Sequence, residues 1–364
     1  MKMSDPAELF AAVRDEAGRV LVANEEVLEG LTVAFLTDGH VLLEGVPGIA
    51  KTTIANLFAR IVGLESRRIQ MTPDLLPADV TGTKIYREQT GEFDLQKGPI
   101  FSNVVVADEI NRATPKTQSA LLEAMQEGQV TVEGETLKLP SPFMVIATQN
   151  PIEMEGTFDL PEAQRDRFHL KLVVGIPDRA SETKLLDRFN DEPNLGPEDV
   201  ERRLSAEDIA EAKATVAEVH VDPTVRDYVL DVVGATRSNA DVEFGASPRA
   251  AITYLHAAKA RAAIEGREYV IPDDVKALAE RVLAHRLVLS TDAELSDVEP
   301  REVIRDVLAT VTPPDASDQA SAAAAVGDGG DVGTPTDGDR ATDSAHGGDT
   351  TPSTEPVDDA DDDG

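Results

Sequence analysis

The sequence predicts an α/β core in which flanking helices surround a parallel β-sheet, followed by a small all-helical domain and a disordered acidic tail. Three apolar runs, beginning at Val41, Val104 and Phe143, each lead directly into polar groups, as buried parallel strands do at a functional edge. From about Ser181 the apolar residues recur only at helical intervals. After Thr312 large apolar residues almost vanish, so that segment cannot bury enough surface to fold.

The composition indicates a protein of the cytoplasm. The chain has 364 residues, of which 41% are hydrophobic, enough for two domains. It has no cysteine, which excludes disulfides, thiol nucleophiles and thiolate metal sites. Its six histidines lie far apart without ligand spacing. No apolar run reaches the roughly 20 residues of a membrane helix, and the first residues lack a hydrophobic signal core.

The charge balance is strongly acidic, with 68 Asp and Glu against 34 Lys and Arg and a net charge of −34. Such a surface repels itself in dilute salt and stays hydrated where salt screens it, which predicts a halophilic protein from a salt-rich cytoplasm. Nucleic-acid binding requires clustered basic residues that displace counterions. This chain has no basic run, so we expect no nucleic-acid partner.

The segment of residues 1–36 is predicted to form one or two amphipathic helices that pack on the core. Its apolar residues recur at near-helical intervals. They are Leu9, Phe10, Val13, Val20, Leu21, Val27, Leu28 and Leu31.

A phosphate-binding loop follows the first predicted strand. The strand Val41–Leu43 leads into GVPGIAKT and then into a helical pattern, the order in which backbone N–H groups converge at a helix start. The spacing fits G-x4-G-K-[ST], with Ala50 at the second glycine position. The residues expected to hold the phosphates of ATP are Gly45, Val46, Pro47, Gly48, Ile49, Ala50, Lys51, Thr52 and Thr53.

Four side chains are predicted to carry the chemistry of this loop. In such motifs the lysine, here Lys51, reaches the β- and γ-phosphates, and the hydroxyl of Thr52 ligates Mg²⁺. Asp108 and Glu109 follow the buried strand Val104–Val106 at the carboxyl edge of the sheet. We expect Asp108 to hold Mg²⁺ and Glu109 to polarise the attacking water.

Two β-hairpins interrupt the core pattern. The first, YREQTGEFDL, turns at Thr90-Gly91, and the second, QVTVEGETLKL, turns at Glu133-Gly134. A hairpin inserted in this way projects from the core. Contact with a substrate and mere decoration are about equally compatible with its sequence.

Helix signals dominate the rest of the chain. Ser205 and Asp208 form a capping box, and Asp222-Pro223, Ser247-Pro248 and Pro272 open further helices. The predicted organisation is an N-terminal helical segment at 1–36, a nucleotide-binding core at 37–178, a helical lid at 179–311 and a disordered acidic tail at 312–364.

The ordered set of motifs GVPGIAKT, VVVADEINR, ATQNP, LPEAQRDRF and SPR resembles the MoxR family of AAA+ ATPases over roughly residues 15–290. In that family alanine is ordinary at the position of Ala50. The resemblance implies that Asn150 orients the attacking water, that Arg249 is the second sensor on the lid, and that Arg167 is a finger reaching a neighbouring subunit. Arg165 is the alternative finger.

The resemblance also implies a function. It implies a homo-oligomeric ring, with six as the expected number, that hydrolyses ATP to remodel or mature client proteins together with a partner carrying a von Willebrand factor A domain. Two alternatives stay open: a nucleotide-gated scaffold with little turnover, and a chelatase-like motor that inserts metal. A DNA-acting motor shares the core, but the absence of a basic stripe disfavours it.

Overall fold

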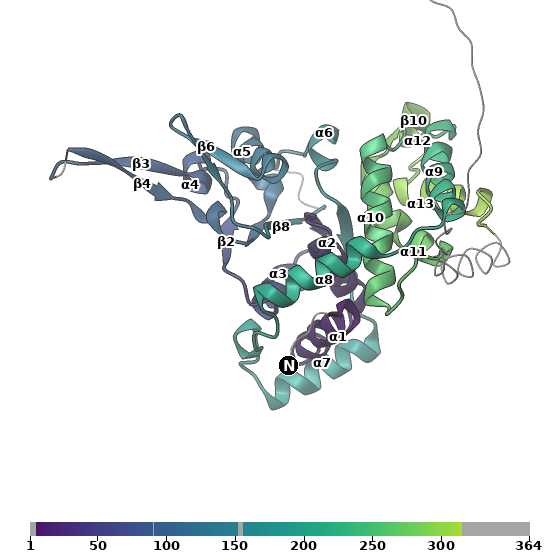
Figure 1. Ribbon diagram of the computed structural model, residues 1–364, viewed down its shortest axis with the longest axis horizontal. Helices are drawn as coiled ribbons and strands as arrows, with labels where there is room; N and C mark the ends of the chain where they lie inside the picture. The colour runs from purple at the N-terminus through teal and green to yellow at the C-terminus, as the bar shows by residue number, and fades with distance from the viewer. Residues whose placement is uncertain (1–4, 90, 152–155, 315–364) are drawn as a thin grey trace, which may run out of the picture. The chain divides into compact units, whose positions relative to one another are not determined.

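The computed structural model describes residues 5–89, 91–151 and 156–314. Apart from its first three residues, the predicted acidic tail lies outside these ranges, as does Thr90 in the first hairpin turn. The described chain is an α/β core joined to a helical lid (Figure 1), and the predicted fold class is confirmed.

The core is a five-stranded sheet in the order β2-β5-β8-β1-β9. Every neighbouring pair is parallel, so the carboxyl ends of all five strands meet at one edge. The strands are β1 (Val41–Glu44), β2 (Ser66–Gln70), β5 (Val104–Asp108), β8 (Met144–Gln149) and β9 (Leu170–Val173).

Both faces of the sheet are buried because successive residues of the inner strands enter two different hydrophobic clusters. In β5, Val104 and Val106 belong to one cluster, and Val105 and Ala107 to the other. This double burial explains why these strands are continuous apolar runs. Helices of the first cluster are α1 (Pro6–Ala17), α2 (Glu25–Leu36) and α3 (Lys51–Ile61), and those of the second are α4 (Pro77–Thr81) and α5 (Pro115–Glu127).

The two predicted hairpins are present. The first pairs β3 (Gly82–Arg87) with β4 (Glu92–Lys97) and projects far beyond the core (Figure 1). The second pairs β6 (Gln129–Val132) with β7 (Glu135–Lys138). Lys84 of the first forms an ion pair of 3.0 Å with Glu135 of the second, so the two hairpins are tied together.

The lid is helical, with one addition that the sequence did not reveal. A two-stranded antiparallel pair joins β10 (Val242–Phe244) to β11 (Val288–Leu289). Strands of three and two residues are too short to show a period of two. The helices from the end of the sheet onward are α7 (Arg179–Asp191), α8 (Ala206–Glu218), α9 (Pro223–Ser238), α10 (Pro248–Ile264), α11 (Pro272–Leu283), α12 (Thr291–Leu295) and α13 (Pro300–Thr310).

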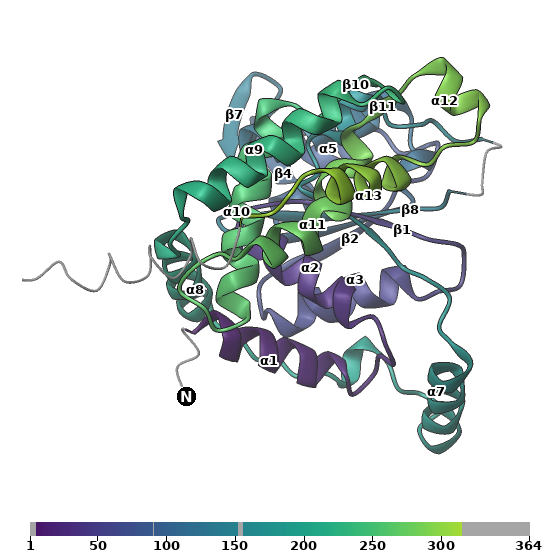
Figure 2. The same cartoon turned by 90° about the vertical axis from the view of Figure 1, so that its right-hand side faces the viewer.

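The predicted caps begin these helices. The Ser205 hydroxyl accepts the N–H of Asp208, whose carboxylate accepts the N–H of Ser205. The side chains of Asp222 and Ser247 each accept one N–H of the first turn of their helices. Helix α7 has no buried residue and stands apart from the sheet (Figure 2). Within the described ranges, none of the helices is both long and apolar enough to cross a membrane.

The lid shares its hydrophobic core with the sheet, since one cluster continues from α3 and β1 into α10 and α11. A buried ion cluster adds to this join. Asp274 at the start of α11, fully buried, accepts from Arg261 and Arg267, and Arg261 also donates to Glu29 of α2 at 2.9 Å. The N-terminal helices therefore contact both the core and the lid.

His40, directly before β1, is buried, and its side chain forms hydrogen bonds to two other segments of the core. Its Nδ1 accepts the N–H of Val145 in β8 at 3.0 Å, so Nε2 carries the proton that it donates to the carbonyl of Met125 at 3.0 Å. Burial lowers the pKa of His40 to about 4, and only the hydrogen bond to Met125 and the charge of Asp38 act in the other direction. Protonation of Nδ1 would break the bond to β8.

We predict that the stability conferred by neutral His40 is fully present above pH 6.5 and is lost as the pH falls from 6.5 towards 4. The lowered pKa corresponds to roughly 3–4 kcal/mol. His40→Gln should flatten this part of a plot of the free energy of unfolding against pH, whereas exposed His220→Gln should leave it unchanged. An unaltered profile in His40→Gln would contradict the assignment.

Candidate active site

The loop between β1 and α3 is shaped by two residues with little conformational choice. A Cβ on Gly45 would lie 2.7 Å from the carbonyl oxygen of Val174, so the chain can pass β9 there only as glycine. Ala50 adopts a left-handed conformation with φ of 65°. A glycine would adopt this φ without strain, which explains why glycine is usual there and why alanine costs about 1 kcal/mol.

Lys51 begins α3 and turns back over the loop. Its ammonium donates to the carbonyls of Gly45 and of Val46, the latter at 2.8 Å. The charge is thus held over the hollow of the loop. A lysine in this place can meet the phosphates of a nucleotide as a point charge.

Asp108 is the most heavily bonded acid of the site and is only 5% exposed. Its Oδ1 accepts the hydroxyls of Thr52 at 2.8 Å and Thr148 at 2.6 Å, and its Oδ2 accepts from Arg68 at 2.5 Å. Burial alone would raise the pKa of Asp108, but the donors from Thr148, Arg68 and Thr52 outweigh burial and lower it. The carboxylate is therefore ionised and oriented.

Glu109 stands in a strained conformation beside it, with φ of 57°, which a glutamate rarely adopts. Its backbone N–H donates to the Thr148 hydroxyl at 2.9 Å. Its Oε2 accepts from Gln70 of β2 and from Arg112, each at 3.0 Å. The Glu109 carboxylate is thus held between Gln70 and Arg112.

A cavity of about 420 Å³ lies over these groups at the carboxyl edge of the sheet. It brings together the loop, both carboxylates and the end of β8, which the sequence placed there from three separate strands. Its lining consists of Pro47, Gly48, Ile49, Ala50, Lys51, Thr52, Thr53, Asp108, Glu109, Thr148 and Asn150. Gly45 and Val46 are not part of the lining, and their carbonyls accept from Lys51.

The predicted arginines do not line this cavity. Arg167 lies just before β9, where the N–H of His169 donates to the carbonyl of His40 at the amino end of β1. Arg249, in the first turn of α10, is close enough to His169 to lower its pKa, although burial is the main cause. Both arginines thus belong to the edge of the sheet opposite the phosphate loop, about 13 Å away along β1.

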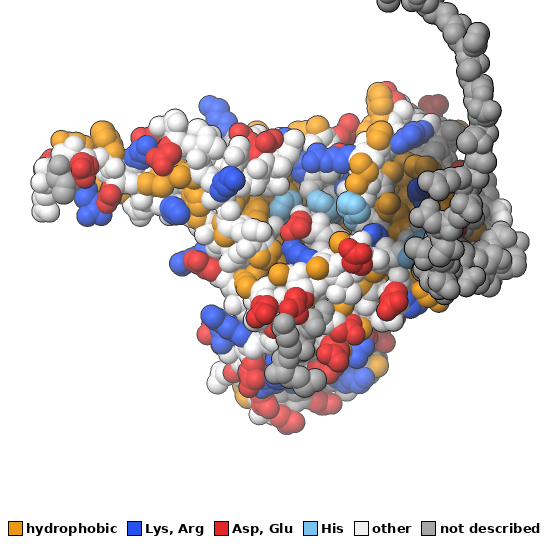
Figure 3. Space-filling model, viewed as in Figure 1, with side chains coloured by type: hydrophobic (Ala, Val, Ile, Leu, Met, Phe, Trp, Pro, Cys, Tyr) orange, Lys and Arg blue, Asp and Glu red, His pale blue; other side chains and the backbone are white. Residues whose placement is uncertain are grey.

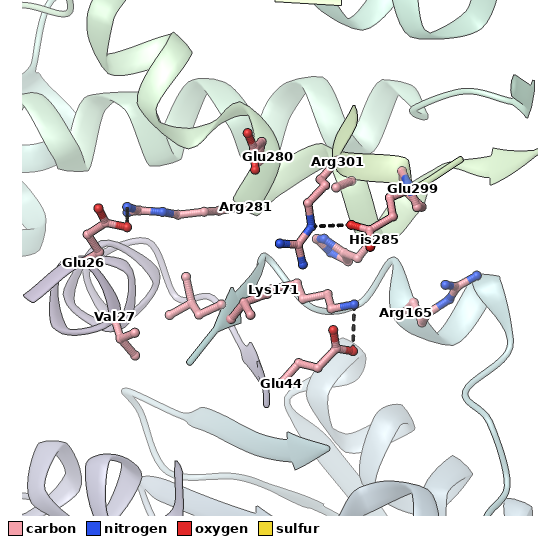
Figure 4. A pocket seen from close by; sticks show the side chains of 14 residues that line it. Glu26, Val27, Glu44, Arg165, Lys171, Glu280, Arg281, His285, Glu299 and Arg301 are labelled. Atoms are coloured by element: carbon pink, nitrogen blue, oxygen red, sulfur yellow. Dashed lines mark hydrogen bonds and ion pairs between the residues drawn. The ribbon is translucent and has the colours of Figure 1, made fainter. Parts of the chain in front are cut away.

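Arg165 belongs to a second cavity, of about 350 Å³, between β9 and the lid (Figure 4). The charges lining this cavity are largely paired with one another. Lys171 donates to Glu44 at 2.8 Å, and Arg281 pairs with Glu26 at 3.2 Å. This cavity therefore offers an anion little unpaired charge, and the chemistry lies in the first cavity.

Sequence reasoning missed Thr148 as a functional residue. Its hydroxyl both donates to Asp108 and accepts from the N–H of Glu109, so one side chain positions both carboxylates. The available signal was its place in the polar end of the strand FMVIATQNP. Arg68 and Gln70 on β2 were missed as well, because an edge strand with exposed polar residues looks like any solvated strand.

The comparisons with known proteins agree with this geometry. The family model described as ATPase family associated with various cellular activities (AAA) matches residues 40–170, and the AAA lid domain matches residues 234–307. The chain is 46% identical to chaperone MoxR1 of Mycobacterium tuberculosis, over 82% of this chain and 81% of that protein. It belongs to the MoxR family of AAA ATPases.

Two further relatives support this membership. Protein MoxR of Methylorubrum extorquens is 31% identical over 86% of this chain and 97% of its own. A crystal structure of an ATPase candidate from Cytophaga hutchinsonii superposes with a TM-score of 0.78 at 41% identity, covering 85% of this chain and 96% of that one. Membership of the family makes the chain an ATP-binding enzyme that hydrolyses ATP.

We predict that Thr148→Val abolishes most ATP hydrolysis, because the valine keeps the shape but leaves Asp108 one donor short and the Glu109 N–H unpaired. The lost bonds should also destabilise the chain by about 1–3 kcal/mol. The rate of ATP turnover measures the loss of hydrolysis, and thermal unfolding measures the loss of stability.

Thr236→Val is the matched control. Thr236 is equally buried and likewise accepts a backbone N–H, from Ala246 at 3.0 Å, but lies in the lid. It should lose similar stability and keep turnover. Equal loss of turnover in both variants would show that Thr148 has no special place in the site.

Proposed function

We propose that this MoxR-type ATPase works as a homo-oligomeric ring, with six copies, in which two neighbouring copies complete each ATP site. The loop residues, Lys51 and the edge carboxylates bind and activate the nucleotide of their own chain. Arg167 and Arg249 serve the nucleotide of the adjacent copy. ATP hydrolysis then moves the lid and remodels client proteins.

The position of the two arginines carries this proposal. Both lie at the edge of the sheet opposite the loop, so neither belongs to the site of its own chain. Within the described residues, neither side chain forms a hydrogen bond or an ion pair, although acidic residues outnumber basic ones two to one. Figure 3 shows histidines gathered beside Lys or Arg side chains on the face between β6 and α10. Two unpaired arginines on so acidic a protein suit the phosphates of a neighbour.

The donor set at the loop fits Mg²⁺. The Thr52 hydroxyl and the Asp108 carboxylate supply hard oxygen ligands, which with phosphate oxygens are the ligands this ion prefers. When bound, the ion would neutralise charge on the transferred phosphoryl group. Thr148 would keep Asp108 oriented throughout, since its hydroxyl bond uses only Oδ1.

Glu109 and Asn150 are proposed to position the attacking water. Both line the cavity, and they end adjacent strands of the sheet. Glu109 accepts only through Oε2 in its bonds to Gln70 and Arg112, which leaves Oε1 for a water proton. A scaffold that binds ATP without turnover has no use for this arrangement, so the enzyme is favoured.

Mixing two inactive variants tests the shared site. Lys51→Ala removes the phosphate lysine and Arg167→Ala removes the finger, so each alone should be inactive. In mixed rings an Arg167→Ala copy still binds ATP and receives the finger of a Lys51→Ala neighbour. If copies assort at random, about a quarter of the sites become complete, and a steady-state assay should recover about that share of the rate.

Lys51→Ala mixed with Glu109→Gln is the matched control, because both lesions lie in the same site and no arrangement restores it. That mixture should stay inactive. Repeating the mixing experiment with Arg165→Ala in place of Arg167→Ala identifies which arginine is the finger. A site shared between copies is contradicted if neither arginine variant that is inactive alone regains activity when it is mixed with Lys51→Ala.

The first hairpin is proposed to contact the client. Tyr86 and Phe93 face each other across β3 and β4 with ring centroids 5.2 Å apart, and they are 53% and 65% exposed. Residues 82–97 contain three basic and three acidic side chains, so the hairpin has no net charge, whereas the whole chain has a net charge of −34. Apolar contact with an unfolded segment is the interaction that this surface offers. The family resemblance adds a partner with a von Willebrand factor A domain.

Tyr86→Ser with Phe93→Ser should abolish binding of an unfolded model protein, such as reduced carboxymethylated α-lactalbumin, in the presence of ATP. Intrinsic ATP turnover should remain, because the hairpin lies outside the site. A fluorescence titration measures the binding. The control is the double variant with Leu230→Ser and Phe244→Ser. It removes two apolar side chains of the lid with matching exposed fractions, 54% and 63%, and should bind the model protein normally. Undiminished binding by the hairpin variant would exclude the hairpin as the contact.

A further inference from the structure

Arg68 is an arginine at the nucleotide site that neither the loop motif nor the shared-site arrangement uses. It lies on β2, the edge strand of the sheet, and its side chain is 51% exposed. Its Nη2 donates to Asp108 Oδ2 at 2.5 Å and to the Gln70 side-chain oxygen at 2.8 Å. It thus places a positive charge on the one oxygen of Asp108 that the threonine hydroxyls do not take.

We infer that Arg68 is a built-in competitor of the divalent cation, holding Asp108 until the metal arrives with the nucleotide. A buried carboxylate without a counter-charge is costly, so a cation must neutralise Asp108 in every state. A guanidinium on a half-exposed side chain can leave at little cost, since exposed ion pairs contribute only about 0–1 kcal/mol. This inference rests on the proposed metal site at Thr52 and Asp108.

The same side chain is linked to the second carboxylate. Gln70 accepts from Arg68 and donates through Nε2 to Glu109 Oε2 at 3.0 Å. When Arg68 leaves Asp108, Gln70 loses the partner that orients its amide. Its hydrogen bond to Glu109 then weakens. Occupation of the metal site and release of Glu109 towards water are thereby coupled, and an empty site keeps Glu109 restrained.

The test is the Mg²⁺ concentration at which ATP binding reaches half its maximum, measured by titrating Mg²⁺ into the full chain with ATP. Arg68→Ala should lower this midpoint roughly two- to fivefold, the fold-change that matches an ion pair of an exposed side chain. In EDTA without nucleotide the same variant should unfold at a lower temperature than wild type, and Mg²⁺ added together with ATP should remove the difference.

Arg67→Ala is the matched control, because it removes the same charge from the adjacent residue of β2, which pairs instead with Glu65 at 3.4 Å. It should leave the midpoint unchanged. An unchanged midpoint in Arg68→Ala would overturn the inference, as would weaker ATP binding by Arg68→Ala than by wild type at saturating Mg²⁺, which would make Arg68 a phosphate ligand. If wild-type ATP binding did not depend on Mg²⁺ at all, the proposed metal site itself would fail.

Discussion

The Asp108 carboxylate is the contact on which the site depends, because it joins three segments that are far apart in the sequence. Through Thr52 it fixes the start of α3 against β5, and through Thr148 it fixes β8. Thr148 in turn holds the strained backbone of Glu109. In the parallel sheet β5, β8 and β1 are consecutive, so one buried acid can set the positions of the loop, the second carboxylate and Asn150.

Arginines with and without acidic partners are distributed unevenly over the protein. Most of the described arginines are paired with acids, as expected where acids outnumber bases two to one. Among the described residues, Arg167 and Arg249 have no acidic partner, and they lie at the edge of the sheet opposite Lys51 and the phosphate loop. The proposed shared site requires head-to-tail contact, which brings the loop of one copy to the two arginines of the next and forms a ring where the rotation between copies closes.

The sequence predicted most of the fold, because both faces of the sheet are buried and each strand is therefore a clear apolar run. It also placed Lys51, Thr52, Asp108, Glu109 and Asn150 together, since carboxyl ends of parallel strands share an edge. It could not reveal β10 and β11, which are too short to show a pattern. Nor could it reveal Thr148 or Arg68, whose roles arise from distances between strands rather than from spacing along one.

The most direct test of a site shared by two copies is the ATPase rate per subunit across a range of protein concentrations, with the molecular mass measured in parallel. The shared site predicts that the rate per subunit rises in step with self-association and falls towards zero where the chain is a monomer. A rate per subunit that stays constant down to concentrations at which only monomer is present would contradict it.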